Sequence, residues 1–346
     1  MTIETFKLAS GYDIPRLIRG GWQLAGDHGE VDRARAIGDM SVFVDAGVDT
    51  FDCADIYTGV EDIIGEFRTK QTQDHKDQKP LRVHTKFVPD LVDLARVDTA
   101  YVRRVITRSL TRLRTSQLDL VQFHWWDYAV PGMVATAQML RGLQDEGLIR
   151  HLGGTNFDAP QTQAMLDAGV PLVSMQIQYS LLDRRASGAM TALCAASPLR
   201  LICYGTLAGG FITERWLGQP EPTELSNRSL IKYKLVIDDF GGWAKFQALL
   251  QTLKDIGQRH GVSLSAVATR WVLDQDFVAA AIVGARYAVH LPEQLQVFSF
   301  KLDPQDHADI HQLLATCPGP QGDTYSLERD RNGRHGRIMK YNLSQA

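Results

Sequence analysis

Four ionisable side chains of different chemical types stand at the ends of consecutive apolar runs. Asp52 ends one run and Tyr57 lies five positions after it, Lys86 ends the next run, and His124 ends the one after that. A carboxylate, a phenol, an amine and an imidazole that meet in one pocket can deliver a proton to a carbonyl group. These four residues are therefore the first candidates for a catalytic group.

The chemistry of this group follows from the ordinary pKa values of its members. A free tyrosine has a pKa of ~10 and is a poor acid near neutrality. A nearby Lys86 ammonium would favour the phenolate of Tyr57 and lower that pKa. Asp52 beside the lysine would keep it charged and oriented, and His124 would hydrogen-bond the carbonyl oxygen and polarise it. General acid catalysis of this kind contributes ~10²–10⁴-fold to a rate.

The group lacks a nucleophile and a metal, so the electrons for reducing a carbonyl must come from a cofactor. A nicotinamide hydride is the obvious source. Each residue alone also has a structural explanation: Tyr57 as a half-buried aromatic, Lys86 as a rim charge, His124 as a core histidine and Asp52 as the cap of a turn. Their combination favours the catalytic interpretation.

Eight apolar runs have the character of buried strands and alternate with amphipathic segments. They cover residues 17–21, 48–53, 82–87, 119–125, 150–155, 172–178, 200–205 and 279–284. Asp98 and Ser263 are expected to cap two of the intervening helices. Strand and helix repeated eight times predict a (β/α)8 barrel, in which the C-terminal strand ends share one mouth. An open doubly wound sheet is the alternative, which the absence of a GxGxxG after an early strand disfavours.

Three further segments depart from the repeat. Residues 5–16 predict a β-hairpin that could plug the barrel floor, and residues 209–243 predict a long loop after the seventh strand. Residues 318–346 form a polar tail. We expect a single domain over 1–346, with a barrel core of about 17–316.

Composition narrows the class of protein. The chain has 346 residues, of which 44% are hydrophobic and 22% charged, with a net charge of −3. These values are typical of a globular chain and indicate neither disorder nor nucleic-acid binding. No apolar stretch approaches 18 residues, the N-terminus does not resemble a signal peptide, and the 4 cysteines are scattered. We therefore expect a cytoplasmic protein that does not bind membranes, with no disulfide framework.

Six ordered blocks resemble the signature segments of the aldo-keto reductase superfamily. They are FDCADIYTGVEDIIG, VHTKF, DLVQFHWWD, GLIRHLGGTNF, SMQIQYSLLDRR and CYGTLAGGF, and the resemblance extends from about residue 14 to about residue 303. It implies a (β/α)8 barrel that binds NADP(H), or less often NAD(H), in extended form. It also implies a catalytic tetrad of Asp52, Tyr57, Lys86 and His124, with Tyr57 as the general acid/base.

The resemblance also implies residues that bind the cofactor and the substrate. Around the nicotinamide these are Thr155, Asn156, Gln176 and the stacking aromatic Tyr204; along the pyrophosphate, Gly205, Leu207 and Gly209; and in the first loop, Gly21 and Trp22. The block VGARYAVHLPEQL resembles the adenosine-phosphate segment and contributes Gly284, Arg286, His290 and Gln294. Trp22 and Trp125 are expected to contact substrate.

The adenosine-phosphate segment departs from the common form of the family. That form has a Lys-Ser pair and an arginine five positions after the serine, where this chain has Gly284, Ala285 and His290. Arg286 follows directly and is able to pair with a phosphate. The balance of these changes favours NADP(H), with NAD(H) as a working cofactor.

The favoured function is an NADP(H)-preferring carbonyl reductase or alcohol or aldose dehydrogenase acting on small molecules. One alternative is a regulatory or auxiliary subunit with little turnover, because some proteins of the superfamily serve ion channels. A metal-dependent barrel hydrolase is a further alternative, but no HxH pair stands at an early strand end and we expect no metal. No motif fixes the substrate, the direction of the reaction or the oligomeric state.

Overall fold

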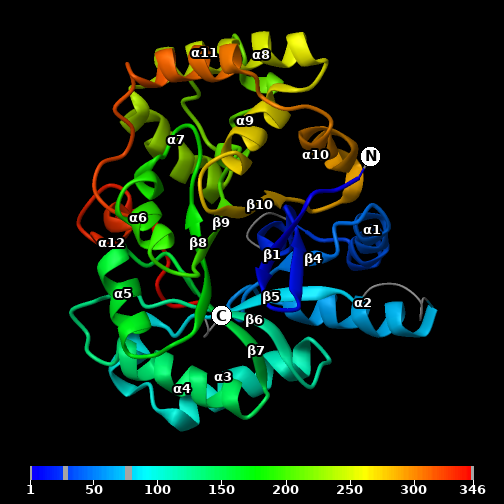
Figure 1. Cartoon of the computed structure of the whole chain (residues 1–346), viewed down its shortest axis with the longest axis vertical. Helices are drawn as coiled ribbons and strands as arrows, with labels where there is room; N and C mark the ends of the chain where they lie inside the picture. The colour runs from blue at the N-terminus through cyan, green and yellow to red at the C-terminus, as the bar shows by residue number, and fades with distance from the viewer. Residues whose placement is uncertain (1, 26–29, 75–79, 344–346) are drawn as a thin grey trace.

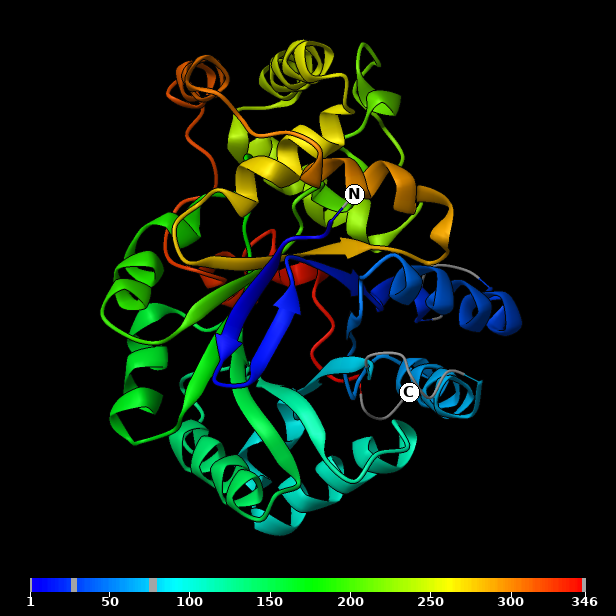
Figure 2. The same cartoon turned by 45° about the vertical axis from the view of Figure 1, so that its right-hand side comes forward.

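The computed structural model describes residues 2–25, 30–74 and 80–343. Eight parallel strands form a closed barrel in the order β10-β3-β4-β5-β6-β7-β8-β9 (Figures 1 and 2). They are β3 (Leu17–Gly20), β4 (Thr50–Asp52), β5 (Arg82–Phe87), β6 (Leu118–Phe123), β7 (Ile149–Thr155), β8 (Leu172–Gln178), β9 (Arg200–Tyr204) and β10 (Val278–Gly284). The predicted (β/α)8 barrel is confirmed, and the doubly wound alternative is wrong.

Helices cover the outside of the barrel. The α-helices are α1 (Arg33–Asp45), α2 (Val60–Asp74), α3 (Thr99–Arg112), α4 (Met133–Asp145), α5 (Ala159–Asp167), α6 (Ala189–Ala195), α7 (Arg228–Phe240), α8 (Trp243–His260), α9 (Leu264–Leu273), α10 (Leu291–Leu295), α11 (Pro304–Leu314) and α12 (Ser326–Arg329). Short 3₁₀ turns are η1 (Trp22–Leu24), η3 (Leu91–Arg96), η4 (Arg185–Ser187), η5 (Ala208–Gly210), η6 (Glu214–Trp216), η7 (Ala288–His290), η8 (Gln296–Phe298) and η9 (Gly336–Ile338). The predicted N-caps hold: Asp98 accepts from the Tyr101 amide and Ser263 from the Ala266 amide.

The N-terminal hairpin lies across the floor of the barrel, as predicted (Figure 2). Its strands β1 (Thr5–Ala9) and β2 (Tyr12–Pro15) pair antiparallel. Leu8, Tyr12 and Ile14 are buried in one apolar cluster with barrel residues such as Ile18 and Leu120. This packing seals one end of the barrel and leaves the opposite mouth for chemistry.

The segment 209–243 corrects the expectation of a long loop, because it contains the 13-residue helix α7. The helix begins after Asn227, whose side chain accepts from the Leu230 amide. Tyr233, Val236, Ile237 and Phe240 are buried on its inner face. Their spacing is helical, so the segment does carry an apolar period, which the flanking polar residues obscure in the sequence.

The polar tail runs back along the barrel instead of leaving it. It contains α12 and η9, and the Tyr341 carbonyl accepts from the Leu91 amide after β5. Residues 344–346 of the expected tail lie outside the described residues. Within the described part of the chain, no helix combines the length and the apolar character that crossing a membrane requires.

Candidate active site at the barrel mouth

The strand ends β4 and β5 hold a buried ion pair. Lys86 Nζ lies 2.9 Å and 2.8 Å from the two Asp52 carboxylate oxygens and 2.8 Å from the Cys53 carbonyl oxygen. Asp52 Oδ1 also accepts from Gln122 Nε2 at 3.2 Å and from Gln176 Nε2 at 2.5 Å. Burial opposes the charge on Lys86, but Asp52 and Tyr57 raise its pKa above the ordinary value. The lysine is therefore held as an ammonium.

Tyr57 lies against this pair, on the turn that follows β4. Its ring centroid is 5.1 Å from Lys86 Nζ and 4.9 Å from the ring of Trp22. Burial raises the pKa of Tyr57 to about 12, while the charge of Lys86 acts in the opposite direction. The expected net lowering of this pKa is thus wrong here, because desolvation outweighs the lysine. The expected sign of the lysine's own effect is right.

His124 follows β6 and is oriented by the end of β7. Its Nδ1 lies 2.9 Å from the Thr155 carbonyl oxygen, and its ring meets Trp126 edge-on at 4.3 Å. Nε2 is buried and has no hydrogen-bond partner among the described residues. Burial, with the charge of Arg329, lowers the pKa of His124 to about 3, so the ring is neutral.

The partner of His124 decides which ring nitrogen carries the hydrogen. A carbonyl oxygen can only accept, so we assign the proton to Nδ1, and Nε2 of the neutral ring carries a lone pair. In this tautomer Nε2 accepts a hydrogen bond and does not polarise a carbonyl as expected. The Tyr57 hydroxyl is then the donor that this group offers to a carbonyl oxygen.

The residues expected around a nicotinamide meet at the ends of β7, β8 and β9. The backbone N–H of Asn156 donates to the backbone carbonyl of Gln176 at 2.9 Å, and the Tyr204 hydroxyl donates to the side-chain Oδ1 of Asn156 at 2.8 Å. Asn156 has a positive φ of 61°, a conformation that asparagine tolerates better than most residues. Thr155 connects this group to His124 through its carbonyl. The structure thus brings Thr155, Asn156, Gln176 and Tyr204 together beside Asp52.

The expected pyrophosphate residues form a turn after β9. Gly205 and Gly209 have φ values of 76° and 65°, and Leu207 lies between them. A Cβ on Gly205 would collide with the Tyr233 hydroxyl, and one on Gly209 would come 2.8 Å from the Tyr233 ring. Packing of α7 therefore explains both glycines, and the turn also presents backbone that a phosphate can approach.

The adenosine-phosphate candidates gather at the end of β10. Gln294 Nε2 donates to the Gly284 carbonyl at 3.2 Å, and Arg286 Nε donates to the Gln23 carbonyl at 3.3 Å. A Cβ on Gly284 would collide with the side chain of Gln23, which comes from the first loop. His290 is exposed on η7. The group lies at the edge of the barrel. Arg286 is the cation closest in sequence to Gly284, which stands where the common form of the family has a lysine.

The two tryptophans expected to contact substrate differ in position. Gly21 donates to the Asp52 carbonyl at 2.8 Å, which brings the following residue, Trp22, against Tyr57. Trp125 has 0% exposure, and its Nε1 donates to the Val130 carbonyl at 3.1 Å. This packing makes Trp125 a core residue and corrects its expected place in the substrate site. The next residue, Trp126, is the tryptophan that contacts His124.

The tail contributes residues that the sequence reasoning missed. Arg329 donates to the backbone carbonyls of Trp125, Trp126 and Asn156, the last two at 2.8 Å and 2.7 Å. Tyr325 places its ring 5.8 Å from that of His124. The partners of Arg329 lie 173 to 204 positions away, so no local pattern could have revealed these contacts.

Below the tail lies a second buried ionic group, which we call the Arg185 latch: Asp183, Arg185 and Glu328. Arg185 contacts Asp183 at 2.7 Å and Glu328 at 2.9 Å and 3.0 Å. All three side chains are at most 3% exposed. The latch fixes α12, and with it Tyr325, to the segment that follows β8.

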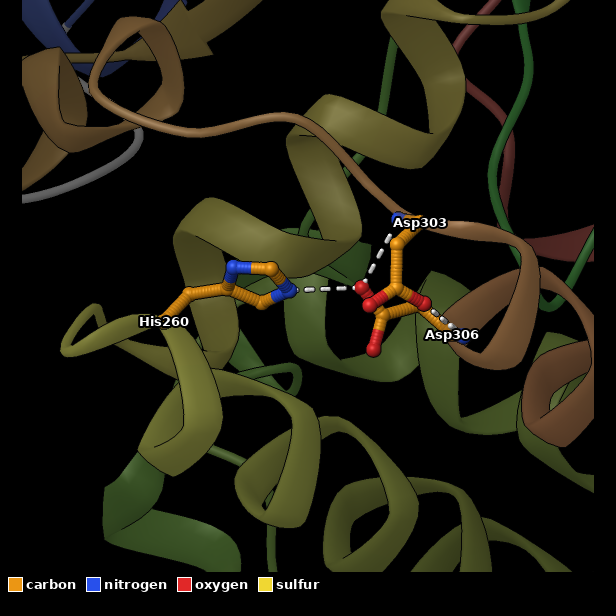
Figure 3. A group of neighbouring side chains, drawn as sticks. All are labelled: His260, Asp303 and Asp306. Carbon is orange, nitrogen blue, oxygen red and sulfur yellow. Dashed lines mark hydrogen bonds and ion pairs between the residues drawn. The ribbon is translucent and has the colours of Figure 1, made fainter.

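A cluster of metal-ligand types lies elsewhere, between α8 and α11. Possible ligand atoms of His260, Asp303 and Asp306 lie within 4.8 Å of one another (Figure 3). Asp303 accepts from the Asp306 amide at 2.9 Å and Asp306 from the Asp303 amide at 3.0 Å, which is a capping box. His260 and Arg259 each contact Asp306 at 2.6 Å. A helix cap whose carboxylate contacts Arg259 and His260 accounts for the cluster, and we assign no metal to it.

Comparison with known proteins adds to this geometry. The family model described as the aldo/keto reductase family matches residues 16–315. Aldo-keto reductase YhdN of Bacillus subtilis is 27% identical over 322 residues, which cover 90% of this chain and 94% of that protein. Flagellar radial spoke protein 5 of Chlamydomonas reinhardtii is 30% identical over 177 residues, 45% of this chain, and the match spans only 33% of that protein.

A solved structure matches over most of the chain. The glycerol dehydrogenase from Gluconobacter oxydans superposes with a TM-score of 0.74 at 23% identity, covering 93% of this chain and 98% of that one. This likeness shows a shared fold.

Proposed function

The chain belongs to the aldo/keto reductase family of oxidoreductases, and we propose that it is an NADP(H)-preferring enzyme that transfers hydride between nicotinamide and a small carbonyl or alcohol compound. Aldehydes, ketones and aldoses are the substrate classes we expect, and residues 1–346 would act as one domain. The observation that carries the proposal is the buried Asp52–Lys86 pair at 2.8 Å, placed beside Tyr57 at the barrel mouth.

In this proposal Tyr57 is the general acid for reduction and the general base for oxidation. Its hydroxyl proton goes to the substrate oxygen as the carbonyl carbon receives a hydride, which the nicotinamide supplies when bound. Lys86 stabilises the phenolate left on Tyr57, and Asp52 holds Lys86 in its charged form. His124 accepts at Nε2 from a substrate hydroxyl, as its hydrogen bond to Thr155 favours.

The residues near Asp52 suit the amide group of a nicotinamide. Asn156 and Gln176 offer amide groups, and Tyr204 offers a ring face beside them. The backbone of Gly205, Leu207 and Gly209 would lie along the pyrophosphate. At the other end, Arg286 would meet the 2′-phosphate, with Gln294 and His290 adding hydrogen bonds.

Titration of the protein with NADPH and NADH, followed by nicotinamide fluorescence, tests cofactor binding. A panel of aldehydes, ketones and aldoses then tests turnover in both directions. We expect the lower dissociation constant for NADPH and reduction of at least one class of carbonyl compound. Tight cofactor binding without turnover on any member of the panel would contradict the proposal and favour a cofactor-binding subunit.

A further inference from the structure

Helix α7 extends a lysine over the barrel mouth. Lys232 Nζ lies 5.2 Å from the ring centroid of Tyr204, 5.4 Å from that of Tyr233 and 5.9 Å from that of Tyr325. The three tyrosines come from β9, α7 and the tail, so segments far apart in sequence enclose one ammonium group. We call Lys232 and these three rings the tyrosine box.

The ammonium of Lys232 lies against aromatic rings rather than a carboxylate. Among the described residues, it makes neither an ion pair nor a hydrogen bond. The nearby carboxylates of Asp183 and Glu328 are both bound by Arg185 in the latch. Burial lowers the pKa of Lys232, although Glu328 acts in the opposite direction. A half-buried cation is thus left beside acids that another residue already neutralises.

The neighbouring Lys234, on the same helix, shows what an ordinary lysine does in this protein. Its Nζ lies 2.5 Å from Asp238 and 2.6 Å from Glu221. Burial opposes its charge, but hydrogen bonds to these two carboxylates raise its pKa. Among the described residues, Lys234 therefore has two carboxylates as direct partners, whereas Lys232, two positions earlier, has none.

The tyrosine box adjoins the proposed active site. The Tyr204 hydroxyl donates to Asn156 at 2.8 Å, and the ring of Tyr325 is 5.8 Å from that of His124. A ligand that reaches both His124 and Tyr204 can therefore place a further group against Lys232. Three aromatic rings around the ammonium lower the local polarity, which strengthens an ion pair formed there.

We propose that Lys232 binds an anionic oxygen of a ligand in this site, and so makes the enzyme prefer substrates that carry a carboxylate or a phosphate. The inference rests on the proposed function of the same site. An ammonium offers a compact charge with three donors, which matches either anion. A phosphate of the dinucleotide has the same chemistry as an anionic substrate and is the other possible source.

The test compares Lys232→Met, the charge-preserving Lys232→Arg and the control Lys234→Met in the whole 346-residue chain. Calorimetry with NADP⁺ present measures the binding of benzoate and of its neutral isostere benzamide, and a separate titration measures NADP⁺. We expect Lys232→Met to weaken benzoate binding by ~10–100-fold relative to benzamide, the usual range for a hydrogen bond to a charged group. Lys232→Arg should recover most of this loss, and Lys234→Met should not reproduce it.

Steady-state kinetics provides the second readout. The ratio of kcat/KM for 4-carboxybenzaldehyde to that for its methyl ester should fall by ~10-fold or more in Lys232→Met. If instead the affinity for NADP⁺ falls and this ratio is unchanged, Lys232 binds an anion and the source is the dinucleotide. Unchanged benzoate affinity, NADP⁺ affinity and substrate ratio in Lys232→Met would overturn the inference.

The two proposals fail in distinguishable ways. If the wild-type protein reduces none of the carbonyl compounds while benzoate binding still depends on Lys232, the proposed function is wrong and the anion site stands. If the wild type is an active reductase and Lys232→Met behaves as Lys234→Met does in every measurement, the function stands and the anion site does not exist.

Discussion

Two buried ionic groups under the barrel mouth differ in how completely the protein satisfies them. In the Arg185 latch, Nε and both terminal nitrogens of the guanidinium contact carboxylates of Asp183 or Glu328. Around the Asp52–Lys86 pair, two neighbouring atoms, His124 Nε2 and Gln122 Oε1, are buried without a partner in the part of the chain that the structure describes, whereas beside the latch only Oε1 of Gln178, whose Nε2 donates to Asp183, is left in this way. Buried polar groups are normally hydrogen-bonded, so exceptions call for an explanation.

The difference separates a structural role from a chemical one. A charged group whose partners are all supplied by the chain holds two segments together, as the latch holds α12 to the residues after β8. A group with unused donors and acceptors can accommodate the polar atoms of a ligand. Substitutions in the latch should therefore change stability, and substitutions around Lys86 should change activity.

The largest expected effect on activity is that of Tyr57→Phe. Only the hydroxyl is removed, and on the proposed mechanism only the transition state needs its proton. We expect kcat to fall by ~10²–10⁴-fold while the dissociation constant of NADPH and the melting temperature stay close to those of the wild type. Single-turnover reduction measures the chemical step. A variant that keeps more than a tenth of the wild-type rate for that step would remove Tyr57 from its proposed role.

Lys86→Met should affect both properties, because Lys86 is part of the proposed chemistry and of a buried pair. It leaves Asp52, which is 5% exposed, without its counter-charge. We expect kcat to fall nearly as far as in Tyr57→Phe and the free energy of unfolding to fall by ~3–5 kcal/mol. Denaturant unfolding measures the stability.

The pH dependence of alcohol oxidation by Lys86→Met isolates the electrostatic effect of the Lys86 charge on Tyr57. Burial raises the pKa of Tyr57, and the lysine is the charge that opposes this. Without it, the basic limb of the profile should move to higher pH. A basic limb that stays at the same pH would show that Lys86 does not change the pKa of Tyr57.

Glu328→Gln should instead reduce stability and leave the reactive groups in place. Burial opposes the charge of Glu328, but Arg185 lowers its pKa to about 2. Because the folded pKa lies below the unfolded value of ~4.3, the ionised carboxylate stabilises the fold above that value, and this stabilisation is lost as pH falls toward 2. We expect a loss of ~3–5 kcal/mol at pH 7 and a smaller difference from the wild type as the pH falls.

The control for the latch is an exposed ion pair. Arg33 and Glu66 lie 2.7 Å apart with 49% and 42% of their side chains exposed. Glu66→Gln should change the free energy of unfolding by ~1 kcal/mol or less. Equal losses in Glu328→Gln and Glu66→Gln would argue that burial does not distinguish the latch from a surface pair.

The sequence was sufficient to predict the features that depend on local patterns. The eight apolar runs gave the barrel, and the alternation around Ser10-Gly11 gave the hairpin, because strand periodicity and turn residues are local properties. The polar residues that end each run were expected to meet, and Asp52, Lys86 and Gln176 do so. The strand ends of a parallel barrel share one mouth, so the fold alone brings these residues near one another.

The features that were missed depend on distant contacts. Arg329 and Glu328 contact partners more than 140 positions away, and no spacing in the tail indicates them. Which ring nitrogen of His124 carries the proton depends on the carbonyl of Thr155. That carbonyl lies beside Nδ1 only because β6 packs against β7. Trp125 was misassigned because a tryptophan beside His124 suits a substrate site and a core equally well, and the backbone direction decides between them.

Arg286→Ala should affect function less than Tyr57→Phe or Lys86→Met does, since it concerns a group at the barrel edge, outside both buried ionic groups. The 2′-phosphate distinguishes NADP(H) from NAD(H) and requires cations or N–H donors. Gly284 and His290 stand where the common form has a lysine and an arginine, so much of the discrimination should rest on Arg286. We expect its loss to weaken NADPH binding by ~1.5–3 kcal/mol and to change NADH binding little. Fluorescence titrations of both cofactors in both proteins measure the selectivity directly. If Arg286→Ala weakens NADPH and NADH binding equally, the arginine contacts a part that the two cofactors share, and the preference for NADP(H) must come from other residues.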